Sequence, residues 1–359
     1  MNNTLLDNSI TNRLKVRLEI LEEFLSNKSI GIQSTGLFHG KMGLAVFYYH
    51  LSKVENCKEN ENKADEFIDS IYEALNSANV SPDFENGAAG IGWGIEYLTQ
   101  NGFLEADTDE VLEEVDNRVY KHIVFEENLP INVGNGLLGY AFYILKRLES
   151  CHNPALSRLL EMLLIEIVNK VVVLVDKQLL KFSEPSGFNL FWELPLTLLV
   201  FGKVLEKGIY SNKIYQLLKE LTPVICTLFP LLHSNRAYLL LGLHAVNKHW
   251  KLPHWKEHAD ILASNTSLLS ILNTEFYDKN IFLRNGMSGA FLIAQTVSEL
   301  NILPNTKLIP ENWTKKILES SMWDILHNEE KPAPAALEFL GGFPGVLTAL
   351  TQNNNLRLS

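Results

Sequence analysis

Residues 135–148 (NGLLGYAFYILKRL) join a Gly-x-x-Gly pair to a long apolar run. The run is too long and too continuous for a strand, so the sequence predicts a buried helix that begins at the glycine pair. The same combination occurs four more times in the chain. The first glycines of the five pairs are Gly40, Gly87, Gly136, Gly286 and Gly342. Random placement of 21 glycines would give roughly one such pair, so composition does not explain the repeat.

The spacing of the pairs predicts how many repeats the chain contains. Successive first glycines lie 47, 49, 150 and 56 residues apart. The long interval has room for two more repeats, and degenerate copies occur there at residues 192–196 (WELPL) and 234–238 (SNRAY), each before another apolar run. The sequence therefore predicts seven units of about fifty residues each.

Segments between the apolar runs predict a second layer of helices. In residues 59–76 (ENENKADEFIDSIYEALN), apolar residues recur at helical spacing with acidic residues between them. Inner helices that are apolar all round and outer helices that are apolar on one side are typical of an all-α fold called an α/α toroid. The sequence predicts that residues 1–359 form one such domain. Glycine at the start of each inner helix would let the helix ends crowd together at one end of the ring. The residues just before each glycine are expected to face a shared central cavity.

Composition excludes several classes of protein. A formal charge of −11 argues against nucleic acid as a partner. Residues 1–10 lack the pattern of a secretory signal. The most apolar stretch, residues 162–180, contains four charged residues and predicts a core helix, so no membrane span is expected. Three widely separated cysteines encode neither a disulfide framework nor a zinc site, which favours a cytoplasmic location.

Seven units with Gly-x-x-Gly at each inner helix resemble the lanthionine synthetase C-like (LanC-like) family over nearly the whole chain. The resemblance implies a seven-unit α/α barrel. It also implies the activity of bacterial members, which cyclise dehydrated peptides with a zinc-activated cysteine thiolate.

The positions that the resemblance assigns to the zinc ligands hold His233, Arg284 and Asn285 in this sequence. Arginine and asparagine are not zinc ligands, so we expect no metal and no cofactor. The position of the family's acid/base histidine aligns with Trp192, and that of an aspartate aligns with Asn132. The sequence thus predicts a peptide-binding or peptide-modifying LanC-like protein without zinc-dependent cyclase activity.

The unit openings supply the candidate site residues. His39 precedes Gly40 and is the candidate acid or base, because its imidazole can exchange a proton near neutral pH. Amides, guanidinium groups and an indole could bind the carbonyls, carboxylates and apolar groups of a ligand. The candidate ligand-binding residues are Asn86, Asn132, Asn135, Trp192, Arg236, Arg284 and Asn285.

Two other functions remain open, together with one further motif. Glu85, Glu193 and Glu338 lie near unit openings, and a pair of carboxylates across a cavity would suit a carbohydrate-active enzyme. Acidic residues at helix starts are also favoured by the helix dipole alone. The third possibility is a non-catalytic interaction scaffold. Residues 254–258 (HWKEH) match a zinc-protease pattern, but their polar surroundings predict an exposed outer helix.

Overall fold

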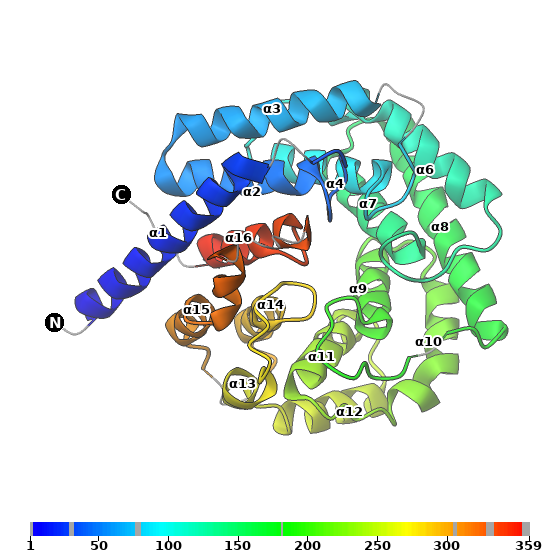
Figure 1. Cartoon of the computed structure of the whole chain (residues 1–359). Coiled ribbons are helices and arrows are strands. Elements are labelled where there is room, and N and C mark those ends of the chain that lie inside the picture. Colours follow the sequence, from blue (N-terminus) through cyan, green and yellow to red (C-terminus); the bar gives the residue numbers. More distant parts are fainter. Residues whose placement is uncertain are drawn as a thin grey trace.

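The computed structural model describes residues 3–28, 32–75, 80–180, 182–303, 307–327 and 334–353. These residues form helices and connecting loops without a β-strand, arranged as two concentric layers around a ring (Figure 1). The inner layer consists of α2 (Lys41–Glu55), α4 (Ala88–Gln100), α7 (Leu137–Ser150), α9 (Glu193–Glu206), α11 (His233–Asn247), α14 (Met287–Glu299) and α16 (Phe343–Asn353). The predicted seven-unit α/α toroid is confirmed.

The outer layer covers the ring from outside. It consists of α1 (Asn3–Lys28), α3 (Lys58–Leu75), α6 (Glu113–Phe125), α8 (Pro154–Asp176), α10 (Ser211–Ile225), α12 (Pro253–Ser264) and α15 (Pro310–Leu318). The short elements between them are α5 (Thr108–Val111), α13 (Leu268–Ser270), η2 (Ile271–Glu275), η3 (Ser321–His327) and η4 (Pro334–Leu337).

The pattern of burial follows the pattern of the sequence. On α2, every residue from Met42 to Tyr49 is buried, whereas α3 buries one face only. The helix expected over residues 162–180 is the second half of α8, and it belongs to the outer layer. Its inner face is buried, but Met162 is 64% exposed because it lies on the opposite face. Within the described residues, no helix is both long enough and apolar enough to cross a membrane.

The second glycine of each pair is required by space. The neighbouring unit opening lies so close that a Cβ at Gly139 would be 2.6 Å from Cβ of Phe84, and one at Gly43 would be 2.6 Å from Cβ of Phe339. Real Cβ contacts of that length do not occur, so glycine permits the helix starts to pack against one another. The expectation that the glycines gather at one end of the ring is confirmed.

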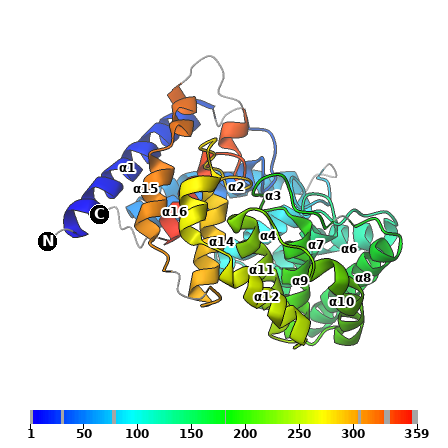
Figure 2. The same cartoon turned by 90° about the horizontal axis from the view of Figure 1, so that it is seen from below.

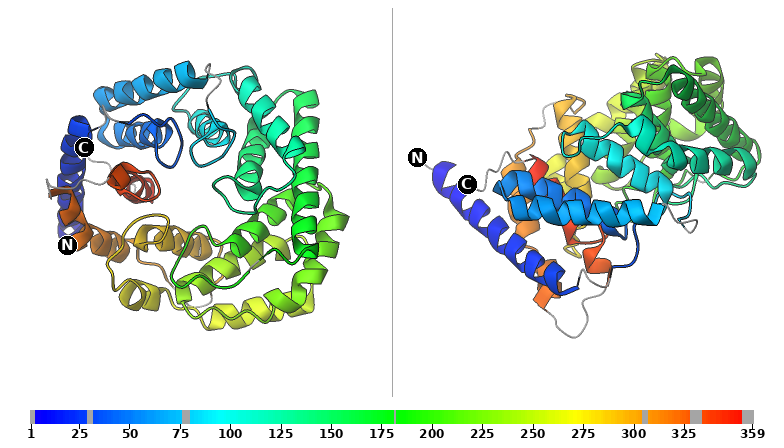
Figure 3. Two further views of the ribbon diagram at one scale, coloured as in Figure 1. Left: turned by 45° about the vertical axis from the view of Figure 1, so that its right-hand side comes forward. Right: turned by 90° about the horizontal axis from the view of Figure 1, so that it is seen from above.

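The two ends of the chain meet where the ring closes. Helix α1 packs against α15, η3 and α16, and α16 packs against α2. Figure 2 and Figure 3 show α1 running along the outside of α15. A row of leucines on α1 is buried in this contact: Leu14, Leu18, Leu21 and Leu25. The first and last described helices therefore complete one closed ring.

Candidate functional site

The loops before the inner helices meet at one end of the ring and are tied together by backbone hydrogen bonds. The donors and acceptors are Leu190 N–H to Arg284 O (2.7 Å), Arg284 N–H to Leu340 O (3.0 Å), Phe339 N–H to Phe38 O (2.8 Å), Phe38 N–H to Glu85 O (2.9 Å) and Glu85 N–H to Gly134 O (3.1 Å). We call this chain of segments, residues 38–39, 84–85, 134, 190–191, 284 and 338–340, the central arc. Every unit except the fifth contributes to it.

The fourth unit takes the place of the fifth in the arc. Its loop passes over the start of α11, where Leu190 accepts a hydrogen bond from the Tyr238 hydroxyl (2.7 Å). Phe188 from the same loop lies 3.0 Å from the position that a Cβ of Gly289 would occupy. The fourth unit thus contacts the sixth directly. As a consequence the arc has a break, between Gly134 and Leu190.

His39 lies on the arc between two carboxylates. Its Nε2 is 2.6 Å from Oε1 of Glu85, and its Nδ1 is 3.0 Å from Oε1 of Glu338. The first contact is a hydrogen bond, while the second has the distance of an ion pair without hydrogen-bond geometry. All three side chains are about one-third exposed or less. Both ring nitrogens of His39 thus face carboxylates, and Nδ1 is buried, so the two glutamates fix the orientation of the imidazole.

Two glycines make room for these carboxylates. A Cβ at Gly134 would lie 2.5 Å from Oε2 of Glu85, and a Cβ at Gly341 would lie 2.5 Å from Oε2 of Glu338. The sequence indicated the glutamates separately but gave no sign that both would contact His39. Glu193, the third glutamate at a unit opening, is not part of this cluster.

An aromatic stack carries a cation beside this cluster. Phe191 stacks on Phe38 with ring centroids 5.2 Å apart, and the guanidinium carbon of Arg284 lies 4.9 Å from the Phe191 centroid. The Arg284 side chain is exposed, and in the described part of the chain it has no carboxylate partner. The arc thus presents a cation on an aromatic surface.

The asparagines predicted to bind a ligand lie at the openings, with different surroundings. Asn86 and Asn135 are exposed. Asn285 is exposed as well, and its Oδ1 accepts a hydrogen bond from the amide of Asn280 (3.1 Å). Asn132 accepts a hydrogen bond from the N–H of Asn135 (3.1 Å), so its side chain shapes the turn.

Trp192 and Arg236 require corrections. Trp192 is only 4% exposed and is the N-cap of α9, the place that glycine holds in other units, so its indole lies in the core. The residue equivalent to His39 and Asn86 is Phe191, one position earlier. Arg236 does not face the arc: its guanidinium donates to the carbonyls of Pro230, Leu231 and Asn265, because the loops around α11 leave these acceptors unpaired.

Two glutamates that the sequence did not indicate hold the start of α11. Glu184 accepts hydrogen bonds from the N–H groups of Leu231 and Leu232, and Glu275 accepts from those of His233 and Ser234. Carboxylates are stabilising here because the helix start carries free donors and a partial positive charge. A cavity of about 500 Å³ beside them is lined by Ser234, Glu275 and Asn285 among others, so it adjoins the arc.

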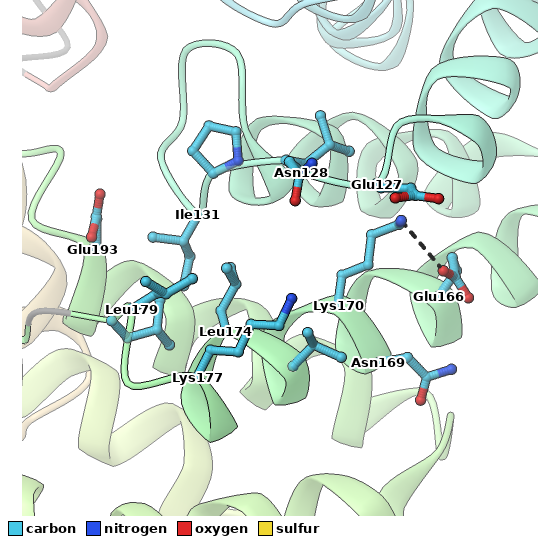
Figure 4. Close-up of a pocket in the computed structure, with 14 residues that line it drawn as sticks. Glu127, Asn128, Ile131, Glu166, Asn169, Lys170, Leu174, Lys177, Leu179 and Glu193 are labelled. Carbon is cyan, nitrogen blue, oxygen red and sulfur yellow. Dashed lines mark ion pairs between the residues drawn. The ribbon is translucent and has the colours of Figure 1, made fainter.

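A groove opens at the break in the arc. It has a volume of about 550 Å³ and lies between the loop before α7, the second half of α8 and the start of α9. Figure 4 shows Ile131 and Glu193 at one end and the ion pair of Lys170 with Glu166 (3.7 Å) at the other. Burial raises the pKa of Glu193 above its ordinary value. We call this feature the side groove.

The comparisons with known proteins agree with this architecture. A family model described as lanthionine synthetase C-like protein matches residues 31–188. A solved structure named nisin cyclase matches with a TM-score of 0.66 and 14% identity, covering 96% of each chain. The chain is thus similar to the lanthionine synthetase C-like family over residues 31–188, and it shares the fold of nisin cyclase. A search of curated protein sequences found no match.

The donors present at the positions that the resemblance assigns to zinc do not fit the ion. Nδ1 of His233 accepts hydrogen bonds from the N–H of Ser267 (3.2 Å) and from Arg236 (3.3 Å), so that nitrogen is occupied. Arg284 is a cation that would repel the metal, and the Asn285 oxygen already accepts a hydrogen bond. Over the described ranges, no group of three His, Cys, Asp or Glu residues is arranged to hold a metal ion.

Proposed function

We propose that this LanC-like protein binds a peptide across the central arc and has no zinc-dependent cyclase activity. The observation that carries the proposal is the exposed Arg284 guanidinium, which stacks on Phe191 without a carboxylate partner among the described residues. Such a cation is free to form charge-assisted hydrogen bonds with an acidic side chain or a terminal carboxylate. The similarity to a nisin cyclase, a protein that acts on a peptide, supports a peptide as the ligand class.

The rest of the arc offers groups that suit a peptide backbone. The exposed amides of Asn86 and Asn135 can each donate to a carbonyl and accept from an N–H, and that of Asn285 can donate. His39, oriented by Glu85 and Glu338, stands at the centre of the arc and would move a proton to a ligand once one carboxylate had given up its contact. Arg284 would then fix the orientation of the bound peptide.

The side groove gives an extended peptide a way out of the arc. Ile131 and Glu193 line the groove, and Gly134 and Phe191, which lie two or three residues away in sequence, belong to the arc. Elsewhere the arc is closed by backbone hydrogen bonds between neighbouring loops. A peptide longer than the arc would therefore continue through the break.

The position of His39 argues against the carbohydrate-active alternative. Catalytic carboxylate pairs need the sugar, and in some enzymes a water, between them. Here the imidazole of His39 stands between Glu85 and Glu338, at 2.6 and 3.0 Å. A sugar ring could enter that space only after His39 had moved away.

The proposal is tested with a display library of random 12-residue peptides. The library is selected on the wild-type protein, and the Kd of the enriched peptides is measured against wild type, Arg284→Ala and Arg158→Ala. Arg158 is an exposed arginine on the outer helix α8 and serves as the matched control. We expect enriched peptides to carry an acidic residue, and Arg284→Ala to weaken binding about fivefold or more, since hydrogen bonds to charged groups contribute about 1.5–3 kcal/mol before solvent screening.

Two results would contradict peptide binding at the arc. One is a library that yields no binders. The other is a set of binders whose Kd is unchanged in a protein that carries both Arg284→Ala and Phe191→Ala. Either result would leave the interaction scaffold as the remaining function.

A further inference from the structure

A second cavity lies at the end of the ring opposite the central arc. It is formed by the middle and C-terminal parts of α4, α7, α9 and α11, has a volume of about 550 Å³, and we call it the basal cavity. The arc lies at the N-terminal ends of α4, α7 and α9 and passes over the start of α11. The basal cavity is therefore separate from the proposed peptide site. Its volume is within the range of small-molecule sites.

The floor of the basal cavity is apolar and accessible. Trp93, Phe142, Leu199 and Ala245 line it and are only partly buried. Trp93 is held by a parallel stack on Tyr97, with ring centroids 5.3 Å apart. The fixed indole of Trp93 and the phenyl ring of Phe142 line the same cavity, and the apolar body of a ligand can pack on them.

The rim of the basal cavity is positively charged. It includes four lysines, Lys146, Lys203, Lys207 and Lys248, and two glutamates. Glu149 pairs with Lys146 and Glu206 pairs with Lys203, both at 3.0 Å. Lys207 and Lys248 have no carboxylate partner in the part of the chain that the structure describes. This rim therefore has a surplus of positive charge in a chain whose formal charge is −11.

The electrostatic environment of Glu206 agrees with this surplus. A hydrogen bond from Lys203, with Lys248 and His249 nearby, holds the pKa of Glu206 below its ordinary value. Lysine near the C-terminus of a helix is favourable for the helix dipole alone, which accounts for each lysine separately. The dipole does not account for the partly exposed aromatic floor between them.

We propose that the basal cavity binds an anionic amphiphile. Its apolar body would lie on Trp93 and Phe142, and its phosphate, sulfonate or carboxylate group would contact Lys207 and Lys248. Both a soluble aromatic anion and the headgroup region of an anionic lipid have this chemistry. The proposal does not depend on peptide binding at the arc, because the two sites lie at opposite ends of the inner helices.

The test uses the fluorescent probe 8-anilinonaphthalene-1-sulfonate, an aromatic anion, with the folded full-length protein. A Lys207→Gln and Lys248→Gln double variant should bind the probe about fivefold more weakly at low salt, because two exposed attractive charge contacts to the sulfonate are lost. The control is Lys219→Gln with Lys256→Gln, two exposed lysines on outer helices, which removes the same charge. Leu199→Trp should abolish probe binding, since a larger side chain fills the floor.

The source of the anion is separated in two further measurements. Displacement of the probe by 1-naphthyl phosphate would indicate a soluble ligand, and co-sedimentation with phosphatidylserine vesicles that the lysine double variant loses would indicate a lipid. Equal probe affinity in the two double variants would overturn the proposal. So would unchanged binding in Leu199→Trp, or the combination of no probe displacement by 1-naphthyl phosphate and no lysine-dependent co-sedimentation with the vesicles.

Discussion

His50 on α2 and His39 just before it are eleven residues apart and have opposite environments. The Nε2 of His50 is 2.7 Å from the Tyr97 hydroxyl, and its ring lies against Phe103 with centroids 4.8 Å apart. Burial lowers the pKa of His50 to about 4. His39 instead lies on the partly exposed arc between two carboxylates.

The buried histidine predicts a pH-dependent stability. Between pH 6.5 and 4 the unfolded chain binds a proton at His50 that the folded chain does not, so the free energy of unfolding should fall as pH falls. Between pH 7 and 5 the loss from this group is about 2 kcal/mol, at 1.36 kcal/mol per pKa unit. Urea unfolding at the two pH values measures it.

The controls for this measurement are two histidine variants. His50→Gln should lose about 2 kcal/mol less than wild type between pH 7 and 5, while His254→Gln, which changes an exposed histidine, should behave as wild type. If wild type and His50→Gln show the same pH dependence, His50 is not buried in its neutral form.

At the scale of elements, the glycine pairs explain how the helices approach one another, and they make a testable prediction. Gly139→Ala places a Cβ against the carbonyl of Val133 and 2.6 Å from Cβ of Phe84, so neighbouring units must separate. We expect a loss of about 1–3 kcal/mol in the free energy of unfolding, as for other overpacked sites. Gly187→Ala is the matched control, because nothing lies within 4 Å of a Cβ at that position. Equal stability of the two variants would contradict the packing argument.

The starts of the inner helices could be predicted from the sequence only where a glycine pair marks them. Where the pair is present, as at Gly87 and Gly136, the helix start and the exposed residue before it were placed correctly. In the fourth unit no glycine marks the start of the inner helix. Trp192 was therefore aligned with the residue before the N-cap, whereas in the structure Trp192 is the N-cap itself. The bridging of the fourth unit over the fifth depends on long-range contacts of Phe188 and Leu190, which no local pattern encodes.

The sequence predicted the positions of most candidate residues in the fold, but it did not predict their contacts. His39, Arg284 and the exposed asparagines lie at the openings as expected. The contact of His39 with Glu85 joins consecutive units, whereas its contact with Glu338 joins the first unit to the seventh and so follows from closure of the ring. Arg236 was misplaced because its three carbonyl partners become close only after the loops around α11 have folded.

At the scale of the whole molecule, closure distinguishes this ring from an open helical array. In an open array each repeat contacts only its neighbours, and a terminal repeat can unfold by itself. Here the first and last helices pack together through α1, α15 and α16. The arc also joins the first unit to the seventh through the bond from Phe339 to Phe38 (2.8 Å). Opening the ring at any place therefore removes support on both sides of it.

Closure predicts that residues 1–359 unfold as a single cooperative domain. Leu18 on α1 is 1% exposed, so Leu18→Ala should cost about 2–5 kcal/mol, whereas Val16→Ala, at a residue that is 50% exposed, should have little effect. In calorimetry, Leu18→Ala at the seam and Gly139→Ala on the far side should each shift one and the same transition to lower temperature. Two separate transitions, with each variant moving only one of them, would show instead that the ring contains independent folding units.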